Sequence, residues 1–232
     1  MIRASWLRTL RMALPVVLLA GYLTAQTAPV AGASAVPVIT FTFDFPASDP
    51  SRYSIAVDSN GHTVYESTVK SEDNSDPENY RVEFAMTPTN RNRIFEWARQ
   101  AKYFEGKVDS GNRKLAFTGD KILSYQDGER SLTARYNYSN IEPVRQVTML
   151  FQKMAGTLDY GRRLTYDHRY QKLALDDVLK RMEAQAKSDE LTEIQSLTPL
   201  LQEIVEDNSV INQVRARAKE LIEIGGSAVA GR

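Results

Sequence analysis

The chain of 232 residues contains no cysteine, and this absence removes several classes of function at once. Without a thiol there is no disulfide, no cysteine nucleophile, no thiolate metal site and no cysteine-ligated iron–sulfur cluster. Histidine is scarce as well, since only His62 and His168 are present. Neither has an H-E-x-x-H motif or a comparable ligand spacing around it. We therefore predict no metal site and no catalytic histidine.

Other motifs that mark catalysis or cofactor binding are also missing. The sequence has no glycine-rich phosphate-binding loop and no G-x-S-x-G nucleophile motif. We predict no catalytic residue and no cofactor. Acidic residues are plentiful, and a pair of carboxylates for hydrolysis is defined by its separation in space rather than in sequence. A hydrolase that uses such unmarked carboxylates is therefore the alternative to a non-catalytic protein.

The first 35 residues differ in composition from the rest. Three arginines within the first eleven residues precede an apolar run at Met12–Tyr22, and Ala33-Ser34-Ala35 fits the small-residue cleavage pattern. The apolar run is shorter than the roughly 20 residues of a membrane span. We expect residues 1–35 to be a cleaved signal peptide with a flexible lead-in. The mature protein is then extracytoplasmic, either periplasmic or secreted, with no stable membrane span.

Acidic and basic residues balance over the whole chain, with 29 of each. After the predicted signal peptide, basic residues exceed acidic ones only in residues 87–183. The segments on either side contain more acidic than basic residues. This is not the clustered basic face of a nucleic-acid-binding domain, so no nucleic-acid partner is predicted. The charge difference between segments favours attraction between them or steering of a charged partner.

Residues 36–138 are dominated by alternating apolar and polar residues, which indicate half-buried strands. Asn60-Gly61 between two such runs predicts a hairpin. A short strand is predicted at Leu115–Thr118. The other predicted strands lie at Val38–Phe45, Tyr53–Val57, Thr63–Val69, Tyr80–Met86, Lys121–Tyr125 and Ser131–Tyr138.

One helix is predicted between these strands, at Thr87–Phe104. Thr87 fits the N-cap, and Pro88 is tolerated in the first turn. Its apolar stripe consists of Ile94, Trp97, Ala101 and Phe104. The predicted fold class is α+β: an antiparallel sheet of about four to seven strands packed on this amphipathic helix, followed by a C-terminal all-α segment.

From Ser139 onward the apolar spacing is helical, and glycine and proline predict the helix ends. We expect a bend or break near 156–162, a kink or end at Thr198-Pro199 and a stop at Gly225-Gly226. Residues 207–221 resemble the second helix of a HEAT-like repeat, but only one helix pair fits, which favours a plain helical hairpin. The predicted division is an α+β domain at 36–158, a helical segment at 159–224 and a disordered tail at 225–232.

A dense group of arginines and tyrosines lies at the start of the helical segment. These residue types are enriched at protein interfaces. A partner-binding surface is one interpretation, and tyrosines seated on the α+β domain beside solvated arginines are the other. The candidate residues are Arg162, Arg163, Tyr166, Arg169 and Tyr170.

The order of several motifs resembles an uncharacterised family of exported bacterial proteins. The similarity is carried by Tyr53–Glu66, Arg93–Gly106, Phe117–Tyr125 and Gly161–Leu164. It implies export and architecture, but no activity or site residue. We therefore predict an exported, non-catalytic binding or protein-interaction module of the cell envelope. The alternatives are the extracytoplasmic hydrolase and a structural envelope component.

Overall fold

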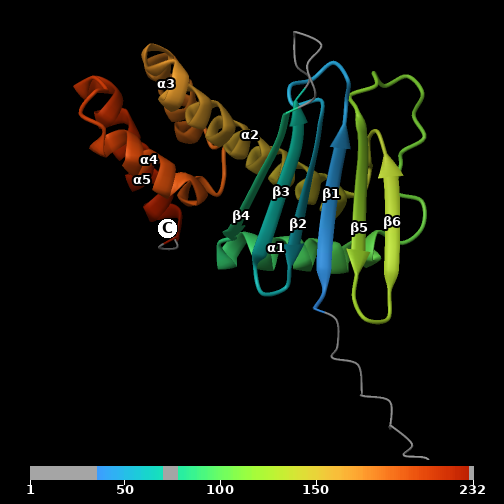
Figure 1. The fold of residues 1–232 in the computed structure, drawn as a ribbon. Coiled ribbons are helices and arrows are strands. Elements are labelled where there is room, and N and C mark those ends of the chain that lie inside the picture. Colours follow the sequence, from blue (N-terminus) through green and yellow to red (C-terminus); the bar gives the residue numbers. More distant parts are fainter. Residues whose placement is uncertain (1–35, 70–77, 230–232) are drawn as a thin grey trace, which may run out of the picture. The chain divides into compact units, whose positions relative to one another are not determined.

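The computed structural model describes residues 36–69 and 78–229. The predicted signal peptide, most of the acidic stretch between the third and fourth strands, and residues 230–232 lie outside this range. Six strands form one antiparallel sheet in the order β4-β3-β2-β1-β5-β6 (Figure 1). They are β1 Val38–Asp44, β2 Arg52–Asp58, β3 His62–Val69, β4 Glu78–Ala85, β5 Asp120–Gln126 and β6 Ser131–Tyr136.

One α-helix lies between the fourth and fifth strands in the chain, and the other α-helices follow the last strand, as the sequence predicts. The α-helices are α1 Pro88–Gln100, α2 Glu142–Tyr170, α3 Leu175–Lys187, α4 Thr198–Glu206 and α5 Asn212–Val229. Short 3₁₀ turns are η1 Lys102–Phe104, η2 Lys172–Ala174 and η3 Ile194–Leu197. The predicted α+β class, with an antiparallel sheet and a C-terminal helical segment, is confirmed.

The predicted strands match the observed ones closely, because each has one face against the helices. The inward residues of β1 and β2 are buried and their neighbours are more exposed. The hairpin between β2 and β3 turns at Gly61, whose φ of +95° suits glycine. Two details were wrong. Leu115–Thr118 is not a strand, and the predicted strand at Ser131–Tyr138 ends at Tyr136.

Helix α1 begins where the sequence predicts and ends earlier. The Thr87 side chain accepts a hydrogen bond from the Asn90 backbone, and Pro88 occupies the first turn. The chain leaves the helix after Gln100 and forms η1 with left-handed backbone angles. Trp97 is only partly buried, whereas Ala98 is fully buried. The small alanine side chain lets α1 approach α2 closely, so the inward face is rotated slightly from the predicted stripe.

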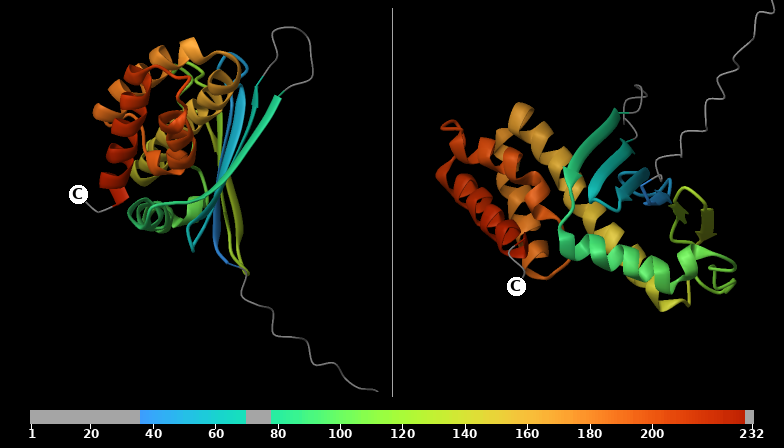
Figure 2. Two further views of the ribbon diagram at one scale, coloured as in Figure 1. Left: turned by 60° about the vertical axis from the view of Figure 1, so that its left-hand side comes forward. Right: turned by 90° about the horizontal axis from the view of Figure 1, so that it is seen from below.

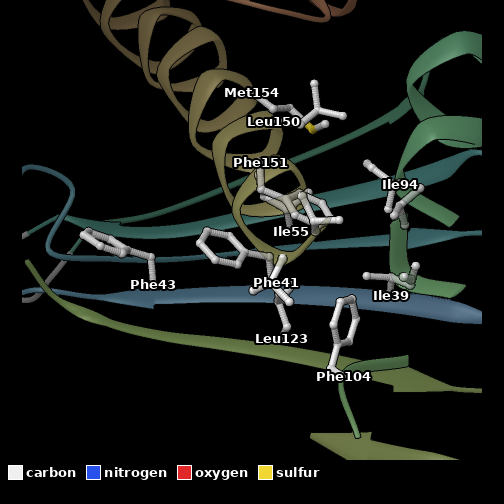
Figure 3. Packing of buried hydrophobic residues seen from close by; sticks show 14 of the residues in the cluster. Ile39, Phe41, Phe43, Ile55, Ile94, Phe104, Leu123, Leu150, Phe151 and Met154 are labelled. Carbon is white, nitrogen blue, oxygen red and sulfur yellow. The ribbon is translucent and has the colours of Figure 1, made fainter. Parts of the chain in front are cut away.

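One face of the sheet is covered by α1 and the first half of α2, and the other face is open (Figure 2). The rings of Phe41 in β1 and Phe151 in α2 stack with centroids 5.4 Å apart and planes 5° apart (Figure 3). Ile94 and Phe104 approach the same core from the α1 side. This apolar core is what positions α2 across the sheet.

Helix α2 is one continuous α-helix, so the chain does not break near 156–162. Ile141 is its N-cap and makes no side-chain cap bond. Gly161 serves packing instead of ending the helix. A Cβ atom there would lie 2.6 Å from a methyl carbon of Leu197 and 3.1 Å from the hydroxyl of Tyr80. Glycine is required where three elements meet at such short range.

The C-terminal helices surround a second apolar cluster that begins on α2 at Leu164. The predicted kink or end at Thr198-Pro199 agrees with the structure, because η3 ends at Leu197 and α4 begins at Thr198, with Pro199 in its first turn. The predicted stop at Gly225-Gly226 was wrong. Helix α5 continues through Gly225, where a Cβ would lie 2.9 Å from the Gln195 backbone nitrogen. The division into two domains at 158/159 stays a prediction, and that boundary falls inside α2.

Candidate functional site

The predicted arginine–tyrosine cluster lies on the second half of α2, where helical spacing aligns residues three and four apart. Tyr166 and Tyr170 are 48% and 62% exposed. Their ring centroids are 5.1 Å apart. The guanidinium carbon of Arg169 lies 5.2 Å from the Tyr170 ring centroid, within cation–π range. These three side chains form one exposed aromatic and cationic surface.

Arg162 and Arg163 are engaged elsewhere. Arg162 donates two hydrogen bonds to one carboxylate oxygen of Asp159, and Arg163 donates from Nε to the other oxygen at 2.7 Å. Both guanidinium groups also lie within 3.6 Å of Asp49, in the turn after β1. The Arg162 side chain is only 14% exposed. These two arginines therefore tie the turn to α2 and present little free charge.

Leu173 adds an apolar side chain beside this surface. It lies in η2, three residues beyond Tyr170, and is 93% exposed. Leu173 was not predicted from the sequence as a surface residue. The apolar face of the following helix begins at Leu175, so the helical pattern excludes Leu173 from the core. We call the four residues Tyr166, Arg169, Tyr170 and Leu173 the α2 end patch.

A second feature is a pocket of about 500 Å³ beside Lys121, at the start of β5. The Lys121 residue is 6% exposed. Its ammonium donates to the Asn137 carbonyl at 3.0 Å and the Thr118 hydroxyl at 3.1 Å, with longer contacts to the Gly119 and Thr118 carbonyls. No carboxylate lies within ion-pair distance among the described residues. Burial lowers the pKa of Lys121 below its usual value.

The strand pattern of the sequence could have identified Lys121 as a candidate site residue. Lys121 alternates with Leu123 and Tyr125, and all three occupy the inward face of β5. A lysine at an inward position of a strand is unusual, because its charge must be desolvated. The pocket is otherwise mostly formed by the end of β6, the segment after it and the first three turns of α2.

Glu193 is a buried carboxylate that lines another pocket, of about 450 Å³. It accepts hydrogen bonds from the Thr87 backbone at 2.9 Å, the Thr87 hydroxyl at 2.7 Å and the Asn90 amide at 2.6 Å. The Gln195 amide donates to it as well. Thr87 and Asn90 lie at the N-terminus of α1, so Glu193 joins the C-terminal helical segment to α1, the helix that packs on the sheet.

Both histidines have an acidic partner. His62 contacts Glu83 at 3.2 Å, and His168 contacts Asp207 at 2.9 Å. Within residues 36–69 and 78–229, no group of three or more acidic or histidine side chains is placed to hold a metal ion. The buried acids Asp159 and Asp167 are eight residues apart on α2, or about 12 Å along the helix axis. That exceeds the roughly 5–9.5 Å separation of carboxylate pairs in glycoside hydrolases.

Comparisons with known proteins do not place the chain in a family. No protein-family model matches it, and no curated protein shows a significant match. In the part of the chain that the structure describes, no helix is both long and apolar enough to cross a membrane.

Proposed function

We propose that this protein is an exported, non-catalytic binding module of the cell envelope, and that the α2 end patch contacts a protein partner. The observation that carries the proposal is the exposure of two tyrosines in ring contact and of Leu173 at one helix end. Exposed aromatic side chains with an arginine are typical of interface hot spots, because they bury large areas with few rotatable bonds. The signal-like N-terminus supports the extracytoplasmic location.

Arg162 and Arg163 are best regarded as supports of this surface. They hold the turn at Asp49 against α2 through Asp159. Charge reversal at these positions would place like charges beside a largely buried carboxylate and damage the fold. Loss of a partner in such a variant would not locate the binding surface. The exposed residues of the patch are the informative ones to change.

The test is a cross-linked pull-down of the tagged protein from its native cell envelope. We expect one partner in a fixed ratio, lost when Tyr166→Ser and Tyr170→Ser are combined. Phe117→Ser is the matched control, because Phe117 is similarly exposed but lies in the segment before β5. A partner that both variants retain would show that the patch is the wrong surface. The absence of any specific partner would overturn the proposal.

A further inference from the structure

The Lys121 pocket contains a buried ammonium that forms no ion pair with any described residue. The ring centroid of Phe43 lies 5.7 Å from this ammonium. Its oxygen acceptors among the described residues are all neutral, and two of them lie at 3.3 and 3.4 Å. Contacts this long are weak, so one proton can turn to a better acceptor. The nearest carboxylate in sequence, Asp120, points to the other sheet face and pairs with Arg135. A buried ammonium in this setting favours an anionic group in the pocket.

Glu142 also lines the pocket, but its carboxylate is already engaged. Arg145 and Gln146, both on the next turn of α2, donate to its two oxygens. The ionisable side chains of the lining are Lys121, Arg145 and Glu142, so their net charge is positive. The exposed surface of this pocket is mostly apolar, with Tyr138 and Met149 at its rim. A ligand that fits must therefore combine one negative group with an apolar body.

A second hollow of about 360 Å³ lies next to this pocket on α2. The two share Gln146 and Met149 as lining residues, and the second adds Trp97 and Leu150. Their combined lining follows α2 from residue 142 to residue 153, a length of about 16 Å at the helical rise per residue. We call these two neighbouring hollows the α2 trough. An extended apolar chain that crosses Met149 can contact both hollows, whereas a compact group can contact only one.

We propose that the α2 trough binds a monomeric amphiphile with one anionic group and an unbranched apolar chain. The ammonium of Lys121 holds the anionic group, and Met149, Leu150 and Trp97 contact the chain. The volume suits a single small molecule and falls in the usual range for ligand pockets. This site is separate from the α2 end patch and does not depend on the proposed function.

The experiment is isothermal titration calorimetry of the full chain with decanoate and with 1-decanol, which share a chain length and differ in charge. We expect saturable binding of decanoate that is at least about tenfold tighter than that of decanol, since a charge-assisted hydrogen bond is stronger than a neutral one. Lys121→Met should abolish this preference. Arg93→Met removes a second positive charge, at the opposite end of the trough, and so distinguishes two positions for the anionic group.

A second variant keeps the test decisive if Lys121→Met does not fold. Met149→Glu places a negative charge in the partly exposed middle of the trough and should weaken decanoate binding about tenfold or more. Leu173→Glu, outside the trough, should leave it unchanged. Equal binding of decanoate and decanol would overturn the proposal. So would a charge preference lost in Arg93→Met but kept in Lys121→Met, or binding only to phosphatidylglycerol vesicles and not to decanoate.

Discussion

At the residue scale, Glu193 joins two segments of the described chain that lie far apart in the sequence. Its carboxylate is 2% exposed and receives donors from Thr87 and Asn90, more than 100 residues earlier. Thr87 and Asn90 are buried too, so their donors lose a strong acceptor if the carboxylate is removed. A buried donor without a partner costs the full desolvation penalty.

Glu193→Ala should therefore lower the free energy of unfolding by about 3 kcal/mol, measured by urea denaturation. Glu190→Ala is the control, because Glu190 is exposed on the same connection. We expect that control to change stability by less than about 0.5 kcal/mol. Equal effects of the two substitutions would contradict the structural role of Glu193.

Asp167 is a buried carboxyl on α2 whose side chain accepts no hydrogen bond from the described residues. Burial raises its pKa above the ordinary value of 3.8, and the charges of Arg163 and Arg181 partly oppose that rise. A raised pKa means that the folded state binds the proton more tightly than the unfolded state. The ionised carboxylate therefore destabilises the fold at neutral pH, and this penalty disappears as the pH falls below 3.8.

Asp167→Asn should accordingly raise the free energy of unfolding at pH 7, because the amide carries no charge to desolvate. The gain should shrink as the pH is lowered toward about 4, where the native carboxyl takes up its proton. Urea unfolding at several pH values measures both. Asp177→Asn, at an exposed position of α3, provides the control. A gain that does not vary with pH would exclude desolvation as its cause.

At the element scale, the two glycines inside α2 have opposite environments. A Cβ at Gly161 would collide with Leu197, whereas a Cβ at Gly156 would make an ordinary contact with Leu191 at 3.5 Å. Gly156→Ala should stabilise the protein by up to about 1 kcal/mol through helix propensity. Gly161→Ala should cost about 1–3 kcal/mol despite the same propensity gain. Thermal denaturation of both variants tests this, and a stabilised Gly161→Ala would contradict the close packing at that site.

Glycine residues also explain why some helix ends could not be predicted from the sequence. Local propensity treats a glycine as a weak point, and Gly156, Gly161 and Gly225 were all interpreted in this way. In the structure, Gly161 and Gly225 allow elements from elsewhere in the chain to approach α2 and α5. The N-cap at Thr87 was predictable, because its hydrogen bond joins residues only three apart.

At the scale of the whole molecule, residues 36–69 and 78–229 belong to one compact unit with two apolar clusters. Helix α2 contributes to both clusters, and Glu193 links α1 to the C-terminal segment. The clusters therefore share a helix and a buried hydrogen-bond network. Elements coupled in this way are expected to unfold together.

Hydrogen exchange measured by mass spectrometry can test this coupling. Leu221→Ala, in the second cluster, should cost about 3 kcal/mol. We expect the slowest amides of β1 and of α5 to lose protection to the same extent in this variant. An exposed-site control such as Ile211→Ala should leave both unchanged. Loss of protection in α5 alone would show that the two clusters unfold independently.

The sequence by itself determined the strands, the helix-rich second half, the start of α1 and the exclusion of thiol chemistry. These follow from composition and from local patterns, in which burial of one face imposes a period of two or 3.6 residues. Only the tertiary structure decided which glycines allow close packing, that Arg162 and Arg163 are held by Asp159 and Asp49, and that Lys121 faces a pocket. Each of these depends on residues far apart in the chain, and local patterns contain no information about such contacts.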